Sequence, residues 1–410
     1  MRNSPRLLLG FLIVWFTPLC AAQNHPLEEI ASKLQQVHIE SDDMPYEVPE
    51  LARPLIPVWK SGIRQAIVNV LSDPKSVHSS ASQLEEAARK ALGEKGVSLP
   101  GDAEAYYGQL VELKLQSVKG IPSLLAVTAA INLACGRDTS LYVFQKRQRA
   151  WNLVLSSSAG AYAGINGGRE SLGYRFSPFG DSSSWYVLLA YSSPWCTSCW
   201  GGLHYEVLRP STDPDKPTVL YSAHRGLYRC GEPPYKLNAT RFEFSIAYLD
   251  GMARDLDLFW KVSVDRFYLA KDRIKRLPPR RQTAADFVDE WIETPDEEAS
   301  ALVTPSVRQQ ALEWHEKLSA WTSGESGERV LSRYDWEQSC AKDGTRWQVK
   351  LSLKSGYKRS EPEMPQALYF VYSVTADGIV LQSIGTEEDL SCKGERARPE
   401  RTDINELELP

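Results

Sequence analysis

The chain has 410 residues, of which 42% are hydrophobic and 24% are charged, and its formal net charge is −5. This length and composition are typical of a folded protein with two or three domains. A basic surplus of the kind that nucleic-acid-binding proteins carry is absent, so the composition does not support that class of function. The 12 tryptophans and 18 tyrosines favour β-rich structure.

Residues 1–22 are predicted to be a secretory signal peptide. Two arginines precede the apolar run from Leu7 to Phe16, and small residues precede a cleavage point near Gln23. Lipidation of Cys20 is an alternative, although the residue before it is a leucine rather than a small residue. We therefore expect a secreted or periplasmic protein that meets the membrane only through this segment.

Six cysteines remain after the signal is removed, and in an exported chain an even number predicts disulfides. They are Cys135, Cys196, Cys199, Cys230, Cys340 and Cys392. Four of them lie in the middle of the chain, where pairing among themselves is expected in an unresolved order. The last two are predicted to pair with each other. Closing that loop contributes up to about 4 kcal/mol on the chain-entropy model.

Helical spacing of apolar residues dominates residues 24–103, which we predict to be a helical region. A first helix is expected from Asn24, and a second carries Trp59, Ile63 and Ile67 on one face. The pattern Ser82-x-x-Glu85 predicts a capping box at the start of a third helix, which should end at Gly93.

Alternation of apolar and polar residues predicts an antiparallel β domain over residues 104–275. About three weak repeats align on Leu124, Val187 and Phe244, and each contains a strand, an irregular loop and two further strands. This rhythm is typical of propeller-like blades or of a sandwich built from successive hairpins. The small-residue segment 156–168 within it is predicted to be a mobile rim loop.

The segment Trp195-Cys196-Thr197-Ser198-Cys199 allows three interpretations. A thioredoxin-type redox pair of Cys196 and Cys199 needs a helix directly after the motif, whose N-terminus lowers the thiol pKa. Two glycines and a period-two run follow instead, which predicts a strand and a structural disulfide. A zinc knuckle would need a fourth ligand where Arg209 stands, so no metal site and no cofactor is predicted.

An α+β domain is predicted over residues 282–395. Thr283 should cap its first helix, and a longer helix follows with His315 beside its apolar stripe, where we expect the imidazole to be solvated. Four antiparallel strands around the turn Asp377-Gly378 complete an arrangement that resembles NTF2-like or cystatin-like folds. Residues 396–410, mostly acidic from Glu400 onward, are predicted to form a disordered tail.

Three segments carry a resemblance to a known group: Cys135 to Tyr142, Pro194 to Trp200, and Asp286 to Trp291. They resemble an uncharacterised group of exported bacterial proteins of the acidobacterial type. This resemblance implies export and assigns no activity.

The sequence therefore predicts an α+β multidomain binding or interaction protein rather than an enzyme. Its expected partner is an unidentified protein or glycan. Trp195, Trp200 and Tyr205 are predicted to contact that ligand, since exposed aromatic side chains often anchor binding surfaces. The alternative function is thiol–disulfide exchange at Cys196 and Cys199.

Overall fold

The structure is a computed structural model of the whole chain. It describes residues 27–37, 48–94, 97, 106–133, 136–160, 162, 168–178, 185–193, 199–228, 235–254, 257–270, 273–279, 283–322, 332–353 and 364–399. Every structural statement below concerns these residues.

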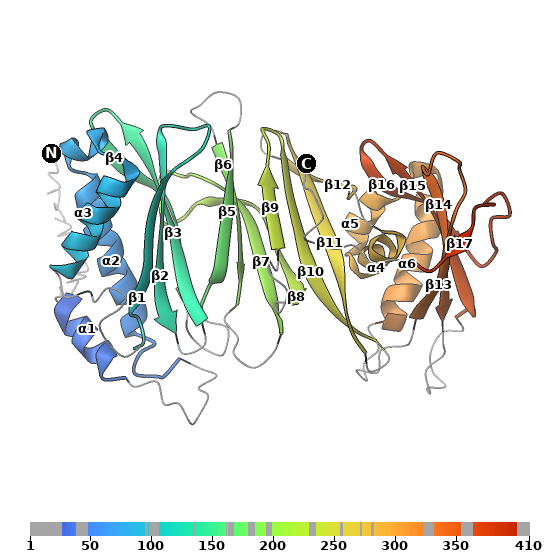
Figure 1. The fold of residues 1–410 in the computed structure, drawn as a ribbon, viewed down its shortest axis with the longest axis horizontal. Coiled ribbons are helices and arrows are strands. Elements are labelled where there is room, and N and C mark those ends of the chain that lie inside the picture. The colour runs from blue at the N-terminus through green and yellow to red at the C-terminus, as the bar shows by residue number, and fades with distance from the viewer. Residues whose placement is uncertain are drawn as a thin grey trace, which may run out of the picture.

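The molecule is a row of layers along its longest axis (Figure 1). Helices α1–α3 come first, followed by three four-stranded antiparallel sheets, which we name A, B and C. Helices α4–α6 lie between sheet C and the last sheet, D, which has five strands. The prediction of a mainly antiparallel β protein with additional helices is therefore confirmed.

The first helical layer consists of α1 (Leu27–Gln35), α2 (Leu55–Leu71), a 3-10 turn (Pro74–His78) and α3 (Ala81–Gly93). Three predicted features of this layer can be compared with it. The end of the third helix at Gly93 is confirmed, whereas the start predicted at Asn24 lies outside the described residues. The capping box is two residues earlier than predicted, at Ser80 and Gln83. Glu85 instead accepts a hydrogen bond from the backbone N–H of Leu115 at 3.0 Å, so it ties α3 to β1, at the edge of sheet A.

Sheets A, B and C are meanders, in which each strand pairs with the next along the chain. Sheet A contains β1 (Leu110–Ser117), β2 (Leu124–Leu133), β3 (Gly136–Arg147) and β4 (Ala150–Ser157). Sheet B contains β5 (Glu170–Pro178), β6 (Trp185–Ser192), β7 (Trp200–Arg209) and β8 (Thr218–Tyr228). Sheet C contains β9 (Tyr235–Ala239), β10 (Glu243–Arg254), β11 (Asp257–Ala270) and β12 (Arg273–Leu277).

The weak sequence repeat corresponds to these meanders. Leu124, Val187 and Phe244, on which the repeats were aligned, all lie on the second strand of their sheet. Each unit has four strands rather than three, because the first strand of each sheet was not recognised. The third unit also needs a correction. Residues 258–262 and 267–270 were predicted to be its two further strands, but they belong to the single long strand β11, and the last strand of the unit is β12.

Apolar side chains fill the space between successive sheets. On β6, Val187 and Leu189 pack against sheet A, whereas Leu188 and Ala190 pack against sheet C. A strand that is covered on both faces needs apolar residues at every position, and this explains the uninterrupted run from Trp185 to Ala190.

A buried ionic network joins sheets B and C to α4 (Ala284–Glu293). The Arg276 guanidinium lies 2.5 Å from a carboxylate oxygen of Asp265 and 2.6 Å from one of Glu290. Burial alone would raise the pKa of Asp265, but Arg276 and Arg225 outweigh it and lower that pKa. The Tyr205 hydroxyl donates a hydrogen bond to the same carboxylate.

The C-terminal layers comprise helices and sheet D. After α4 come α5 (Asp296–Ala299), two 3-10 turns (Ser300–Leu302 and Pro305–Val307) and α6 (Arg308–Thr322). The strands are β13 (Ser332–Ser339), β14 (Arg346–Leu353), β15 (Ala367–Thr375), β16 (Gly378–Gly385) and β17 (Arg396–Ala397).

Two predictions for this region are confirmed and two are wrong. The Thr283 side chain caps α4, and Gly378 occupies the turn between β15 and β16 with φ of +136°. His315 is not solvated: it is 2% exposed, because its ring packs edge-on against Trp291 with centroids 5.0 Å apart. The predicted disordered tail begins too early, since β17 pairs with β13; residues from 400 onward lie outside the described part.

None of the described helices combines the length and the apolar character that crossing a membrane requires.

Candidate functional site

A cleft of about 470 Å³ lies where α2, sheet A and sheet B meet. Lys60 and Arg64 on α2 form one wall, Ser156 and Ser157 at the end of β4 form another, and Glu206 on β7 contributes to a third. The turn between β7 and β8 closes one side, because the Ser156 N–H donates a hydrogen bond to the Pro214 carbonyl at 2.7 Å. The cleft therefore depends on three layers of the fold.

A buried ion pair forms the floor of this cleft. The Lys60 ammonium donates to Asp138 at 2.5 Å, to the Tyr162 hydroxyl at 2.8 Å and to the Ala159 carbonyl at 2.9 Å. Burial lowers the pKa of Lys60, and the adjacent Asp138 offsets part of that effect. Since an ammonium has three N–H donors and all three have protein acceptors, Lys60 is an anchor between the helical layer and sheet A.

Asp138 itself is fully buried on β3 and accepts from several directions. The Tyr162 hydroxyl donates to one of its oxygens, and the backbone N–H of Arg169 donates to the other at 3.1 Å. Burial raises the pKa of Tyr162, and the Asp138 carboxylate raises it further. The hydroxyl therefore stays protonated and remains a donor at physiological pH.

Two side chains of opposite charge in the cleft have no ion-pair partner among the residues that the structure describes. The Arg169 guanidinium donates to the Ser157 hydroxyl at 2.6 Å and lies 4.5 Å from the centroid of the Tyr191 ring. Glu206 forms no hydrogen bond or ion pair with any described residue, and no contact within 4.0 Å joins it to Arg169. Arg64 differs, because it is paired with Asp215. Arg169 and Glu206 are thus the charges that the fold leaves available to a ligand.

A column of stacked rings extends from Arg169 along sheet B. Tyr191 stacks on His204 with centroids 5.2 Å apart, and His204 stacks on His224 at 4.3 Å. Burial is the main cause that lowers the pKa of His204 to about 4, with further contributions from His224 and Arg169. His204 is therefore neutral at pH 7. A Cβ on Gly202 would lie 2.5 Å from the Nε2 atom of His224, so a larger residue there would displace the His224 ring.

The structure describes only some of the residues first predicted as the site. Trp195 and Cys196 fall outside the described residues. Cys199 is disulfide-bonded, and β7 begins at the next residue, Trp200, which confirms the predicted strand after the motif. Tyr205 is fully buried, so it is a core residue of the interface between sheets B and C rather than a contact on an open surface.

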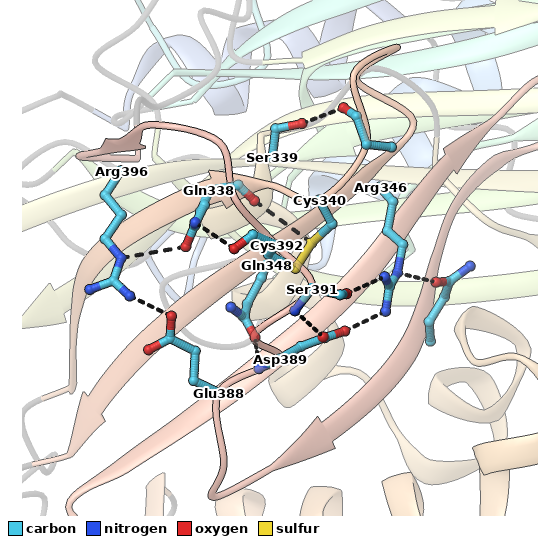
Figure 2. The surroundings of a disulfide bond; sticks show 12 residues. Gln338, Ser339, Cys340, Arg346, Gln348, Glu388, Asp389, Ser391, Cys392 and Arg396 are labelled. Carbon is cyan, nitrogen blue, oxygen red and sulfur yellow. Dashed lines mark hydrogen bonds and ion pairs between the residues drawn. A yellow bond between two sulfur atoms is a disulfide. The ribbon is translucent and has the colours of Figure 1, made fainter.

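The predicted disulfide between Cys340 and Cys392 is confirmed (Figure 2). It joins the end of β13 to the segment after β16, and the Gln338 side chain donates to the Cys392 carbonyl at 2.8 Å. Nearby, Arg346 and Asp389 form an ion pair at 2.6 Å (Figure 2). Cys135, Cys196 and Cys230 lie outside the described residues, so the partner of Cys199 stays a prediction. Within the described ranges no group of three or more His, Cys, Asp or Glu residues is arranged to hold a metal ion.

Sequence reasoning did not identify the cleft residues Lys60, Arg169 and Glu206, or Asp138, the buried partner of Lys60. They come from α2, β3, the segment before β5, and β7, and they converge only when the sheets stack. One sequence feature does coincide with the cleft: the small-residue segment predicted as a rim loop begins with residues 156–160, which form part of the cleft wall.

Neither the protein-family models nor the curated proteins include a match to this chain.

Proposed function

We propose that this protein is a non-catalytic binding protein of the periplasm or cell exterior, and that its cleft holds a small zwitterion such as a free amino acid or a short peptide. The observation that carries the proposal is the presence of Arg169 and Glu206 in one cleft, neither with an ion-pair partner among the described residues. A ligand with a carboxylate at one end and an ammonium at the other would neutralise both.

The chemistry of the two groups supports this choice of ligand. A guanidinium presents a planar fork of donors that matches a carboxylate, and hydrogen bonds to a charged acceptor are about twice as strong as neutral ones. Ser157, which already accepts from Arg169, orients that fork. The volume of about 470 Å³ is in the range of sites for small molecules.

Binding fits this site better than catalysis by Lys60. A lysine nucleophile needs a free lone pair on its nitrogen, and the Lys60 nitrogen donates to three protein acceptors. The thiol–disulfide alternative is disfavoured by the strand that follows Cys199, since a strand lacks the dipole that lowers a thiol pKa at a helix N-terminus. The disulfide between Cys340 and Cys392 supports an oxidising compartment.

Two architectural proposals accompany the functional one. The repeated four-strand meander supports blade-like units for sheets A, B and C. The packing of α4 and α6 against sheet D supports an NTF2-like or cystatin-like arrangement for the C-terminal layers.

Isothermal titration calorimetry can test the ligand class with three matched probes. L-Leucine carries both charges, N-acetyl-L-leucine carries only the carboxylate, and L-leucinamide carries only the ammonium. We expect the wild-type protein to bind leucine at least tenfold more tightly than either derivative. The proposal fails if all three bind alike or none binds.

Two variants assign each charge to its residue. Arg169→Gln should bind leucine and leucinamide equally, because the carboxylate has lost its partner. Glu206→Gln should bind leucine and N-acetyl-leucine equally for the converse reason. Lys90→Gln is the matched control, since Lys90 lies on α3, does not line the cleft and has a side chain that is 78% exposed, and it should retain wild-type selectivity. Unchanged selectivity in both Arg169→Gln and Glu206→Gln would refute the assignment.

A further inference from the structure

A second hollow, which we name the first-strand groove, lies apart from the cleft. It has a volume of about 700 Å³ and is lined by the end of β1, the β1–β2 turn, β5, β9 and the β9–β10 turn. No residue lines both the groove and the cleft. The groove is therefore an independent site, and its ligand does not depend on the function proposed above.

The charge of this groove is opposite in sign to that of the whole chain. Among the residues that the structure describes, its lining includes Lys119, Arg175 and Arg241 but no aspartate or glutamate, whereas the chain carries a net charge of −5. Lys119 forms no ion pair with the described residues, and within the same set the Arg175 side chain donates one hydrogen bond, to the Tyr174 carbonyl at 2.9 Å. Local positive charge of this kind attracts an anionic ligand, since the low-dielectric walls of a concave site focus its field.

The uncharged side chains of the groove combine rings with amides. Tyr174 and Phe176 are half-buried, with ring centroids 5.7 Å apart and planes at 74°. The Tyr174 hydroxyl donates to the Gln116 side chain at 3.2 Å, and Asn238 adds a second amide. Phe242, the neighbour of Arg241, is 39% exposed, and the Arg241 guanidinium lies 5.0 Å from its ring.

We infer that the first-strand groove binds an acidic oligosaccharide, that is, a short chain of sugar rings that carry carboxylates. Sugar rings have flat faces of C–H groups that pack on aromatic rings, and their hydroxyls hydrogen-bond to amides. Their carboxylates pair with the guanidinium and ammonium groups. An anion without rings would make no packing contact with Tyr174 and Phe176, and a neutral sugar would form no ion pair with Lys119 or Arg175.

Calorimetric titration with three probes tests the ligand class. The probes are tri-galacturonic acid, the uncharged trisaccharide maltotriose, and tri-glutamate, a peptide with acidic side chains but no sugar rings. We expect tri-galacturonic acid to bind at least tenfold more tightly than the other two at 50 mM salt. Its affinity should fall as the salt concentration rises, because exposed ion pairs are screened.

Variants place the binding in the groove. Lys119→Gln and Arg175→Gln should each weaken tri-galacturonic acid binding about tenfold, the value for loss of one charge-assisted contact. Arg147→Gln is the matched control, because Arg147 is an exposed arginine outside the groove lining, and its guanidinium donates to the Gln145 side chain. Its affinity should equal that of the wild type. An unchanged thermal unfolding midpoint in each variant shows that the fold is retained.

Three outcomes would overturn the inference. The first is the absence of tri-galacturonic acid binding to the wild type. The second is equal or tighter binding of tri-glutamate, which would make the groove a site for acidic peptides. The third is equal loss of affinity in Arg147→Gln and Arg175→Gln, which would indicate attraction by net charge alone.

Discussion

Replacing Lys60 with methionine should lower the free energy of unfolding of the N-terminal layers by about 3–5 kcal/mol. The methionine keeps much of the apolar stem but leaves the Asp138 carboxylate, which is fully buried, without its cation. Asp138→Asn should cost a similar amount, because it leaves the Lys60 ammonium, 6% exposed, with neutral acceptors only.

The double variant Lys60→Met with Asp138→Asn separates the ion pair from the packing around it. Asparagine retains one oxygen that can accept from the Arg169 N–H, and its amide NH₂ group takes the place of the oxygen that accepted from the Tyr162 hydroxyl, while both charges are removed. We expect the double variant to cost about 1–3 kcal/mol, less than either single change, because neither charge is left buried and unpaired. The coupling between the two sites should therefore exceed about 3 kcal/mol.

Urea unfolding followed by tryptophan fluorescence measures these differences. Trp59 reports on this region, because it is fully buried on α2 and its indole N–H donates to the Gly108 carbonyl at 2.7 Å. Equal m-values across the four proteins are required for the comparison. Additive costs in the double variant, or single costs below about 1 kcal/mol, would refute the interpretation of Lys60 as a buried anchor.

Two further predictions concern pH and the disulfide. The His204 pKa of about 4 is lower than that of an unfolded histidine, so its contribution to stability is present above about pH 6.5 and is lost as the pH falls toward 4. Because the ring is partly exposed, we expect the free energy of unfolding to fall by about 1–2 kcal/mol over this pH range. The His204→Gln variant should not show this fall in acid unfolding, and a pH profile equal to that of the wild type would contradict the prediction. Replacing Cys340 and Cys392 by serine should lower the free energy of unfolding by up to about 4 kcal/mol, because the two cysteines are 52 residues apart. Urea unfolding of the C-terminal layers measures this difference, and a cost below about 1 kcal/mol would contradict the prediction.

The sequence was sufficient to predict many of the helices and strands but not the cleft. Periodicity located α2, α3, α6 and the second strand of each meander, because those segments have strong apolar patterns. The first strands were missed for a physical reason. On β1, alternate residues such as Lys114 and Gln116 are exposed, and β5 carries a glycine and an arginine in its centre, so neither has a strong apolar run.

Burial of polar residues was the harder feature to predict. Tyr205 and His315 have side chains that suit a surface, yet both are buried, because Tyr205 donates to Asp265 and His315 has its Nδ1 atom 2.7 Å from a carboxylate oxygen of Asp296. Their partners lie 60 and 19 residues away along the chain (265 − 205 and 315 − 296). Local pattern contains no information about such pairs, and the cleft residues are a further case of the same kind.

The packing of sheets A and B does not by itself limit how many meanders can be stacked. Sheet B offers an apolar surface on each side, and sheet A does the same, so either could be followed by another copy of itself. Helical layers lie at both ends of the three meanders: α1–α3 cover sheet A, and α4–α6 lie next to sheet C. A further meander cannot be added at these ends, because a helical layer does not offer the flat apolar face of a sheet. A duplication or deletion of one whole meander would therefore leave each remaining sheet covered on both faces, whereas a change of half a meander would expose part of a face. We expect the length of this architecture to vary in evolution by complete four-strand units.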